Sequence, residues 1–298
     1  MNDSRRGIAY AVAAYGFWGL APVYWKALHQ VAPAPLLGYR ILWSCAFGVV
    51  LVSAARAWPE LRRCALSRRR GGPILAAALL LAANWLTFLW AIATGRVLAT
   101  SLGYYVTPLV SVALGVAFLR ERLSRAQVLA LALASAGVLV LAVQLDEAPW
   151  IPLTLAATFG AYGLVRKAAP VGPVAGFGLE MLLLAPAAAA WLVASGTHGP
   201  LLPDAGTAVQ ALAAGSGIVT AVPLLWFNRA ARELRLSTLG FFQYLAPTIT
   251  FLLAVFAYGE HFTAAHAICF ACVWLALGIH SWELLNESGW RSTPEATR

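Results

Sequence analysis

The sequence predicts an all-α, polytopic membrane protein of ten transmembrane helices, arranged as two inverted five-helix repeats. Three observations carry this prediction: the composition, ten long apolar runs, and an uneven distribution of Lys and Arg. Hydrophobic residues make up 61% of the 298 residues and charged residues only 11%, whereas soluble domains carry about a quarter charged residues. A soluble protein this apolar would expose large apolar patches to water, but lipid accepts an apolar exterior.

Ten apolar runs are long enough to cross a bilayer as helices. A span needs roughly 20 apolar residues, because a helix rises about 1.5 Å per residue and the hydrocarbon core is about 30 Å thick. Short loops with Gly, Pro and Arg separate the runs, and no remaining segment would fold as a soluble domain. The predicted spans are 7–28, 35–55, 73–94, 97–119, 125–145, 149–168, 173–195, 207–229, 236–258 and 263–285.

The cationic side chains gather at one end of these spans. With the N-terminus in the cytoplasm, 18 of the 21 Lys and Arg lie in cytoplasmic segments, Arg166 and Lys167 among them. Lys26 and Arg96 lie outside, and Arg40 lies within a span. This bias follows the positive-inside rule and predicts that both termini are cytoplasmic. It also accounts for the net charge of +9 without a nucleic-acid partner, since the basic residues sit in short loops.

The two halves of the chain resemble each other. Pro108 is followed thirteen residues later by Glu121, and Pro247 is followed thirteen residues later by Glu260. We expect both glutamates, which lie just past their spans, to be structural or interfacial. All matches fall at offsets between 137 and 144 residues, and the others pair 101–103 with 238–240, 16–20 with 160–164, and 38–40 with 178–180.

Each half holds five predicted spans, an odd number, so the second half enters the membrane upside down. Inverted repeats of this kind are typical of secondary transporters, whose halves rock to open a midplane cavity alternately to each side. The predicted domains are a first repeat at 1–145, a second repeat at 146–287, and a disordered cytoplasmic tail at 288–298.

Several segments also resemble a known family, the ten-helix drug/metabolite transporter superfamily (EamA-type), and within it the RarD-type branch. The resemblance covers nearly the whole chain. It implies a bacterial inner-membrane exporter or permease of small metabolites, with a cavity lined by spans 1, 3, 4, 6, 8 and 9. One departure is Thr107 before Pro108, where the branch pattern has Asn. The segments are AYGFWG at 14–19, NWLTFLWA at 84–91, SLGYY at 101–105, YGLVRK at 162–167 and LRLSTLGFFQY at 234–244.

Ionisable groups inside spans are costly and are therefore candidates for function. Arg40 and Glu180 occupy matching repeat positions with opposite charge. Their depths differ by roughly 12 Å along the membrane normal, which disfavours a salt bridge between them. We expect Arg40 near an outer gate and Glu180 near an inner gate. The alternatives are a snorkelling arginine and a hydrogen-bonded structural carboxyl.

Aromatic and amide side chains complete the predicted substrate site. Asn84 and Phe88 are four residues apart and share a helix face, and Tyr15 and Trp18 are three apart. Packing between helices is the alternative for each of them. Pro108 and Pro247 are the predicted hinges, since proline kinks a helix. The predicted substrate-binding set is Tyr15, Trp18, Arg40, Asn84, Phe88, Tyr105, Tyr162, Glu180, Trp226, Asn228, Gln243 and Tyr244.

These residues predict a secondary transporter of small organic metabolites or drugs, such as amino acids or aromatic amphipathic solutes. A P-loop is absent from the sequence, and no cofactor is expected. Cys269-x-x-Cys272 with His266 is interpreted as helix packing, not a metal site. Proton-coupled antiport through Glu180 and facilitative exchange both remain open. An intramembrane enzyme or a sensory protein is the alternative from another class, and the expected partners are a small-molecule substrate and the lipid bilayer, with the oligomeric state left open.

Overall fold

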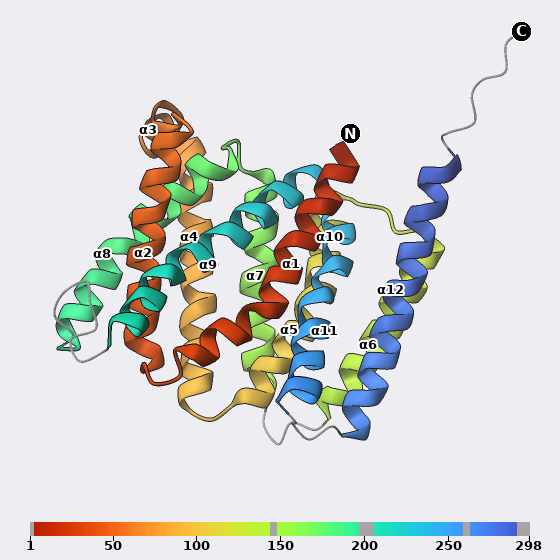
Figure 1. Ribbon diagram of the computed structural model, residues 1–298. Coiled ribbons are helices and arrows are strands. Elements are labelled where there is room, and N and C mark those ends of the chain that lie inside the picture. Colours follow the sequence, from red (N-terminus) through yellow and green to blue (C-terminus); the bar gives the residue numbers. More distant parts are fainter. Residues whose placement is uncertain (1–2, 144–147, 197–205, 259–262, 291–298) are drawn as a thin grey trace, which may run out of the picture.

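The computed structural model describes residues 3–143, 148–196, 206–258 and 263–290, with side chains up to residue 283. Every regular element in these segments is helical, and the helices stand side by side in one bundle, several of them tilted (Figure 1). In chain order they are α1 (Asp3–Ala27), α2 (Pro33–Ala54), α3 (Trp58–Ala65), α4 (Arg68–Ala93), α5 (Val97–Leu119), α6 (Arg125–Ala142), α7 (Trp150–Ala168), α8 (Pro173–Ala194), α9 (Thr207–Glu233), α10 (Leu236–Gln243), α11 (Leu245–Leu252), the π-helix η1 (Leu253–Ala257) and α12 (Ala264–Trp290).

The start of α1 and the end of α12 lie at the same end of the bundle, at the top of Figure 1. We call this end the terminal face, and the other end the opposite face. The short helix α3 and the connection from α7 to α8 also lie at the terminal face (Figure 1).

Eight of the described helical segments are long and apolar enough to cross a membrane: α2, α4, α5, α6, α8, α9, α12 and the run from α10 to η1. Helices α1 and α7 are not among the eight. Both pack against several other helices, α1 against α9, α10 and α11, and α7 against α4, α5 and α9. Because protein covers them, their surfaces need not be apolar throughout. The fold is that of an all-helical, polytopic membrane protein.

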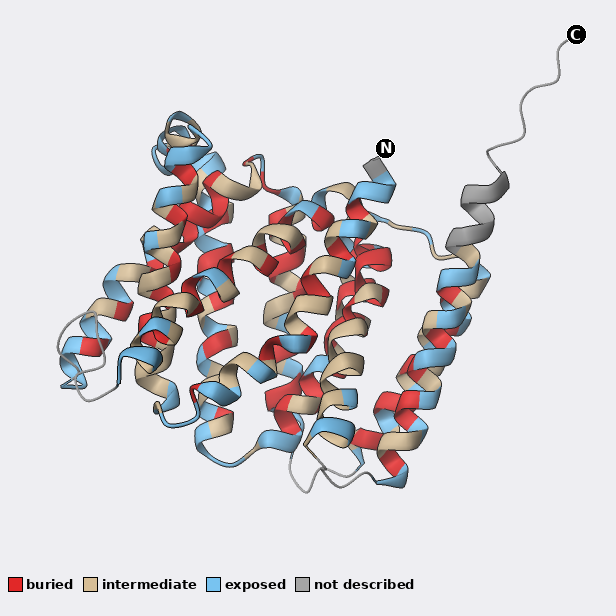
Figure 2. Ribbon diagram, viewed as in Figure 1, coloured by how far each residue is buried: buried red, intermediate tan, exposed pale blue. Residues whose placement is uncertain are grey.

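The outside of the bundle is apolar. Buried residues line the interior surfaces of the helices, while exposed residues face outward along the full length of the bundle (Figure 2). An exterior of this kind is costly in water and stable in lipid, where each helix satisfies its own backbone hydrogen bonds. Exposed large apolar side chains include Leu20, Val50, Leu79, Phe118, Leu139, Trp191, Leu275 and Trp282.

The predicted spans coincide with observed helices, with differences at their ends. Helix α9 continues to Glu233, four residues past the predicted end, and α4 begins at Arg68, five residues before the predicted start. Helix α12 runs to Trp290, five residues past the predicted end of the tenth span at 285. Charged and polar residues extend these helices beyond the apolar run, because a helix end that leaves the membrane no longer needs apolar side chains.

Helix α3 was not predicted, since its sequence reads as a basic loop. Pro59 lies in its first turn with Glu60, while Arg62 and Arg63 lie in its last turn. Proline suits the start of a helix, and this order of charges complements the helix dipole. Leu61 and Cys64 are the buried residues of this helix. Glu60 also reaches the second half of the chain, where its Oε1 accepts a hydrogen bond of 2.7 Å from the Gly172 N–H that precedes α8.

The ninth predicted span is a broken helix. Helix α10 ends at Gln243, α11 begins at Leu245, and Tyr244 lies between them. Pro247 lacks the N–H that would bond the carbonyl of Gln243 four residues earlier, which accounts for the break. The matching proline behaves differently: α5 continues through Pro108 as one helix. Both hinge roles stay predictions.

Glu121 links the two halves at the terminal face. Its carboxylate accepts hydrogen bonds from the backbone N–H groups of Leu236 (2.7 Å) and Ser237 (2.8 Å), at the start of α10. These N–H groups have no partner within their own helix. Glu121 therefore acts as a helix cap supplied by another segment, while its predicted counterpart Glu260 lies outside the described residues.

Replacing Glu121 with alanine leaves two N–H donors of α10 without an acceptor. We expect the free energy of unfolding to fall by about 1–2 kcal/mol, the usual cost of losing a helix cap. Glu121→Gln keeps one acceptor oxygen and should lose about half as much. Thermal unfolding of the purified variants in detergent measures both changes, and equal stability of all three proteins would show that the cap contributes nothing.

Candidate functional site

Three residues of the predicted site meet in a network between α7, α8 and α9. Tyr162, Glu180 and Asn228 come together there with Arg166, and we call these four residues the buried polar cluster. None is more than 1% exposed. Arg166 Nε lies 3.3 Å from Glu180 Oε1. A charged pair this far from water is stable only with good geometry and further hydrogen bonds.

The hydroxyl of Tyr162 joins the ion pair to α9. It lies 3.3 Å from Glu180 Oε2 and 3.1 Å from Asn228 Nδ2. Since the hydroxyl carries one proton, it donates to the carboxylate and accepts from the amide. Each carboxylate oxygen of Glu180 thus faces one partner, and Tyr162 connects α7 to both α8 and α9.

Helix geometry explains how the cluster forms. Tyr162 and Arg166 are one turn apart on α7, and Gly176 and Glu180 are one turn apart on α8, so two matched faces oppose each other. The guanidinium of Arg166 lies directly over Gly176, where a Cβ atom would collide with Nη1. Its Nη2 donates to the carbonyl of Pro173 at 3.4 Å. Only glycine at position 176 leaves room for this arrangement.

Aromatic rings pack next to the cluster. Tyr162 is stacked on Phe227, with ring centroids 5.8 Å apart. Trp18 contacts Tyr15 at 5.5 Å and Phe159 at 5.7 Å. Tyr15, Tyr162 and Phe227 belong to the largest buried apolar cluster of the described residues, which joins α1, α2, α4, α7, α8, α9 and α10, and Trp18 and Phe159 pack against it. Trp226 packs against the edge of this cluster and contacts Phe17 at 6.1 Å.

Arg40 lies apart from the buried polar cluster, and its partners are different. Its Nε donates to Thr220 Oγ1 on α9 at 2.6 Å. Its guanidinium carbon lies 4.6 Å from the ring centre of Trp85 and 5.1 Å from that of Trp25. Arg40 is partly exposed, although α1, α4 and α9 surround it. The described residues thus keep Arg40 and Glu180 in separate environments.

The other predicted residues serve contacts between helices. Asn84 Nδ2 donates to the Leu155 carbonyl at 2.9 Å and to Thr158 Oγ1 at 3.0 Å, and so ties α4 to α7. Gln243 Oε1 accepts from Ser111 Oγ at 3.1 Å and ties α10 to α5. Phe88 packs beside Tyr104, with ring centroids 6.2 Å apart.

Tyr105 and Tyr244 belong to a second buried cluster, formed by α5, α6, α10 and α12. Tyr105 contacts Phe270 of α12 at 5.8 Å between ring centroids. This cluster does not include Tyr15 or Trp18. The structure therefore separates the predicted aromatic residues, since Phe88 packs against a third cluster formed by Ala91, Ala99, Ile151 and Leu155.

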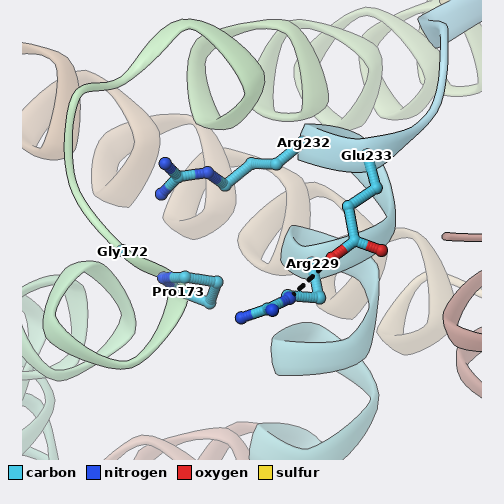
Figure 3. A pocket seen from close by; sticks show the side chains of 5 residues that line it. All are labelled: Gly172, Pro173, Arg229, Arg232 and Glu233. Atoms are coloured by element: carbon cyan, nitrogen blue, oxygen red, sulfur yellow. Dashed lines mark hydrogen bonds and ion pairs between the residues drawn. The ribbon is translucent and has the colours of Figure 1, made fainter. Parts of the chain in front are cut away.

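A cavity of about 400 Å³ opens at the terminal face, where α9 ends and α8 begins (Figure 3). Arg229 Nε pairs with Glu233 Oε1 at 2.8 Å on one side of it, and Arg232 Nη1 donates to the Val171 carbonyl at 2.6 Å. Pro173 links the cavity to the buried polar cluster, because its carbonyl accepts from Arg166. The lining residues are Gly172, Pro173, Arg229, Arg232 and Glu233.

Arg166 was not predicted as a site residue. It was counted with Lys167 as a charge of a cytoplasmic loop, but it is 1% exposed and paired. A signal was present, since Arg166 follows Tyr162 by one helical turn and precedes a loop of only four residues. Thr220 was also missed, because a threonine within an apolar run has no distinctive pattern.

Comparisons with known proteins identify the family. A model of the EamA-like transporter family matches residues 5–143. An uncharacterized transporter of Pseudomonas aeruginosa is 43% identical over 97% of this chain and 95% of its own. Protein RarD of Escherichia coli is 43% identical over 93% of this chain and 94% of its own. The chloramphenicol-sensitive protein RarD of P. aeruginosa is 31% identical over 95% and 96%, respectively.

A solved crystal structure has the same fold. It superposes with a TM-score of 0.71 at 21% identity, and the match covers 93% of this chain and 96% of the other. The sequence relatives are bacterial and their match extends over almost their full length, as does that of this chain. The chain therefore belongs to the EamA-like transporter family of the drug/metabolite transporter superfamily, in its RarD branch.

Proposed function

We propose that the protein is a secondary transporter of small organic solutes that works by alternating access in the bacterial inner membrane. Ten helical segments cross the membrane in this proposal: α1, α2, α4, α5, α6, α7, α8, α9, the run from α10 to η1, and α12. The terminal face is cytoplasmic, as the excess of Lys and Arg in its loops supports. Spans one to five and six to ten form two inverted repeats.

The helix packing supports the inverted repeat. In the proposed repeat α1 corresponds to α7, α4 to α9, and α5 to the run from α10 to η1. The contact of α1 with α9 then has its counterpart in that of α7 with α4, and the contact of α5 with α7 has its counterpart in that of α11 with α1. The contacts α2–α8, α5–α10 and α6–α12 each join two corresponding helices, so the exchange leaves these contacts unchanged. In addition, the family model matches residues 5–143, which is close to the first predicted half. Repeats related in this way favour rocking about a shared interface.

One observation carries the proposal: the equivalent positions 40 and 180 in the two halves carry opposite charges, and only the carboxylate is fully buried and paired. Glu180 at the cytoplasmic end is fully buried and paired with Arg166. Arg40 towards the opposite face is partly exposed and surrounded by three other helices. In this proposal the buried polar cluster closes the pathway between α7 and α8 at the cytoplasmic side. Opening that side requires separation of α7 from α8, towards the cavity at Pro173.

Counterflow in proteoliposomes tests transport directly. We expect saturable exchange of at least one labelled solute from a panel of amino acids, aromatic metabolites and chloramphenicol. Chloramphenicol is included because one relative is named chloramphenicol-sensitive. Liposomes without protein serve as the control, because passive leakage does not saturate. Absence of exchange for a widened panel would contradict the transport proposal while leaving the family assignment in place.

An imposed pH gradient decides between facilitative exchange and proton coupling. We favour facilitative exchange, because it needs no titratable group and Glu180 already has a cationic partner in Arg166. The expected result is exchange of equal rate with and without the gradient. If the gradient does drive uptake, Glu180→Gln should abolish that dependence, whereas Glu233→Gln, which alters a carboxylate outside the cluster, should preserve it. A dependence that survives Glu180→Gln would exclude Glu180 as the proton carrier.

A further inference from the structure

The guanidinium of Arg40 is held in place but only partly used. Its Nε donates to Thr220 Oγ1, and this is its one hydrogen bond to the described residues. No described carboxylate pairs with it. Arg166, in contrast, faces Glu180 at 3.3 Å. A cation inside a membrane protein is costly, so an arginine without a carboxylate partner calls for an explanation.

Snorkelling does not explain the position of Arg40. A snorkelling arginine extends along its own helix to bring its charge into the headgroup region. Arg40 instead reaches across to Thr220, which lies thirteen residues inside α9 from its start at Thr207. Thr220, whose hydroxyl orients the guanidinium, is itself 1% exposed. The side chain is therefore directed into the bundle.

The surroundings of Arg40 are aromatic. Trp85 and Trp25 lie within 5.1 Å of its guanidinium carbon, which stabilises the cation through the faces of the rings. Tyr104 also lies in the neighbourhood of this guanidinium. Phe88 in turn packs beside Tyr104. A solute reaching Arg40 would meet ring surfaces around a single positive charge.

The remaining nitrogens of Arg40 have the geometry of a carboxylate receptor. The Nε contact with Thr220 leaves Nη1 and Nη2 without a hydrogen-bond partner among the described residues. These groups form a rigid planar fork that can bind both oxygens of a carboxylate at once. The single charge of Arg40 balances a monoanion, and a dianion would require a second cation.

We infer that Arg40 is the anion subsite of the transport pathway, and that the substrates are organic monoanions with a carboxylate attached to an aromatic or otherwise apolar body. This inference rests on the proposed transport function and adds the chemical class of the solute. Arg40 binds the carboxylate, Thr220 orients the guanidinium, and Trp25 and Trp85 contact the apolar body. The bound anion supplies the charge that the site lacks.

Matched acid and amide probes test the inference in a binding experiment that needs no transport. Purified wild-type protein is titrated by calorimetry with benzoate and benzamide, cinnamate and cinnamamide, and indole-3-acetate and indole-3-acetamide. Within a pair the shapes agree and only the charge differs. We expect at least one acid to bind about tenfold or more tightly than its amide, as charge-assisted, bidentate hydrogen bonds allow.

Variants assign the preference to Arg40. Arg40→Gln should abolish the preference for the acid, and Arg40→Lys should keep part of it, because a lysine retains the charge without the fork. Thr220→Val should weaken the preference for the acid several-fold, because the guanidinium of Arg40 loses the hydroxyl that orients it. Arg96→Gln is the matched control, since Arg96 also lies over a tryptophan ring, that of Trp90 at 4.7 Å, and it should retain the full preference.

Three results would overturn the inference: no binding of any probe to wild-type protein, equal binding of acids and amides, or an unchanged preference in Arg40→Gln. Thr220→Val and Arg40→Lys keep the test decisive if the glutamine variant does not fold. Arg40-dependent binding without counterflow would remove the transport proposal and keep the anion site. Counterflow of neutral solutes alone, without acid binding, would keep the transport proposal and remove the anion site.

Discussion

Replacing Glu180 with alanine should lower the free energy of unfolding by about 3–5 kcal/mol, the usual cost of breaking a buried ion pair from one side. The reason is the partner left behind. Arg166 is 1% exposed, and without the carboxylate its charge stays buried with the Pro173 carbonyl as its hydrogen-bond acceptor among the described residues. Thermal and denaturant unfolding of the purified variant in detergent measure the loss.

Removing both charges should restore most of that stability. In the double variant Arg166→Met, Glu180→Leu, no charge is left without a partner, and apolar replacements of buried ion pairs are often neutral or stabilising. Glu233→Ala is the control, because it breaks a pair whose Arg229 is 49% exposed, and we expect a change below about 0.5 kcal/mol. A double variant no more stable than Glu180→Ala would contradict this account of the buried polar cluster.

The second large effect is expected at Gly217, where α9 crosses α2. A Cβ atom at this position would lie 2.5 Å from the carbonyl carbon and oxygen of Trp43 and 2.8 Å from the Ser44 nitrogen. These are backbone atoms, so relief requires a shift of one whole helix. Gly217→Ala should therefore cost about 3 kcal/mol, at the upper end of the usual range for overpacking.

The same shift should reach Arg40, because Thr220 lies one turn beyond Gly217 on α9. We expect Gly217→Ala to weaken any Arg40-dependent binding of acids together with stability. Gly16→Ala is the matched control for stability: nothing lies within 4 Å of a Cβ atom there, so the variant should be as stable as wild type or slightly more stable. Equal melting temperatures for the two alanine variants would show that α2 and α9 approach less closely than described.

The sequence predicted the helices well, because a membrane imposes a local rule. Each span must be apolar over a fixed length and satisfy its own backbone, so the length of a run such as 97–119 predicts its helix without reference to its neighbours. The two prolines show the limit of such a local rule, since Pro247 accompanies a break in the ninth span whereas Pro108 lies within a continuous helix. Helix α3 escaped this rule, since it is short, charged and stabilised by contacts of Leu61 and Cys64.

The candidate site depended on information that no local rule contains. Arg40, Glu180 and Asn228 stood out in the sequence as polar residues inside apolar runs. Arg166, in contrast, was placed in a cytoplasmic loop by the positive-inside rule. Whether an arginine near a helix end reaches the headgroups or turns inward depends on what faces it, here Gly176 and Glu180 on another helix.

The sequence by itself thus determined that this protein lies in a lipid bilayer, where its helices run, and to which family it belongs. The tertiary structure alone decided which buried charge has a partner, with Glu180 paired to Arg166 and Arg40 left with Thr220 and two tryptophan rings. The physical reason is that burial of a charge is tolerated or costly according to atoms a few ångströms away. In a helical bundle those atoms come from segments far apart in the chain.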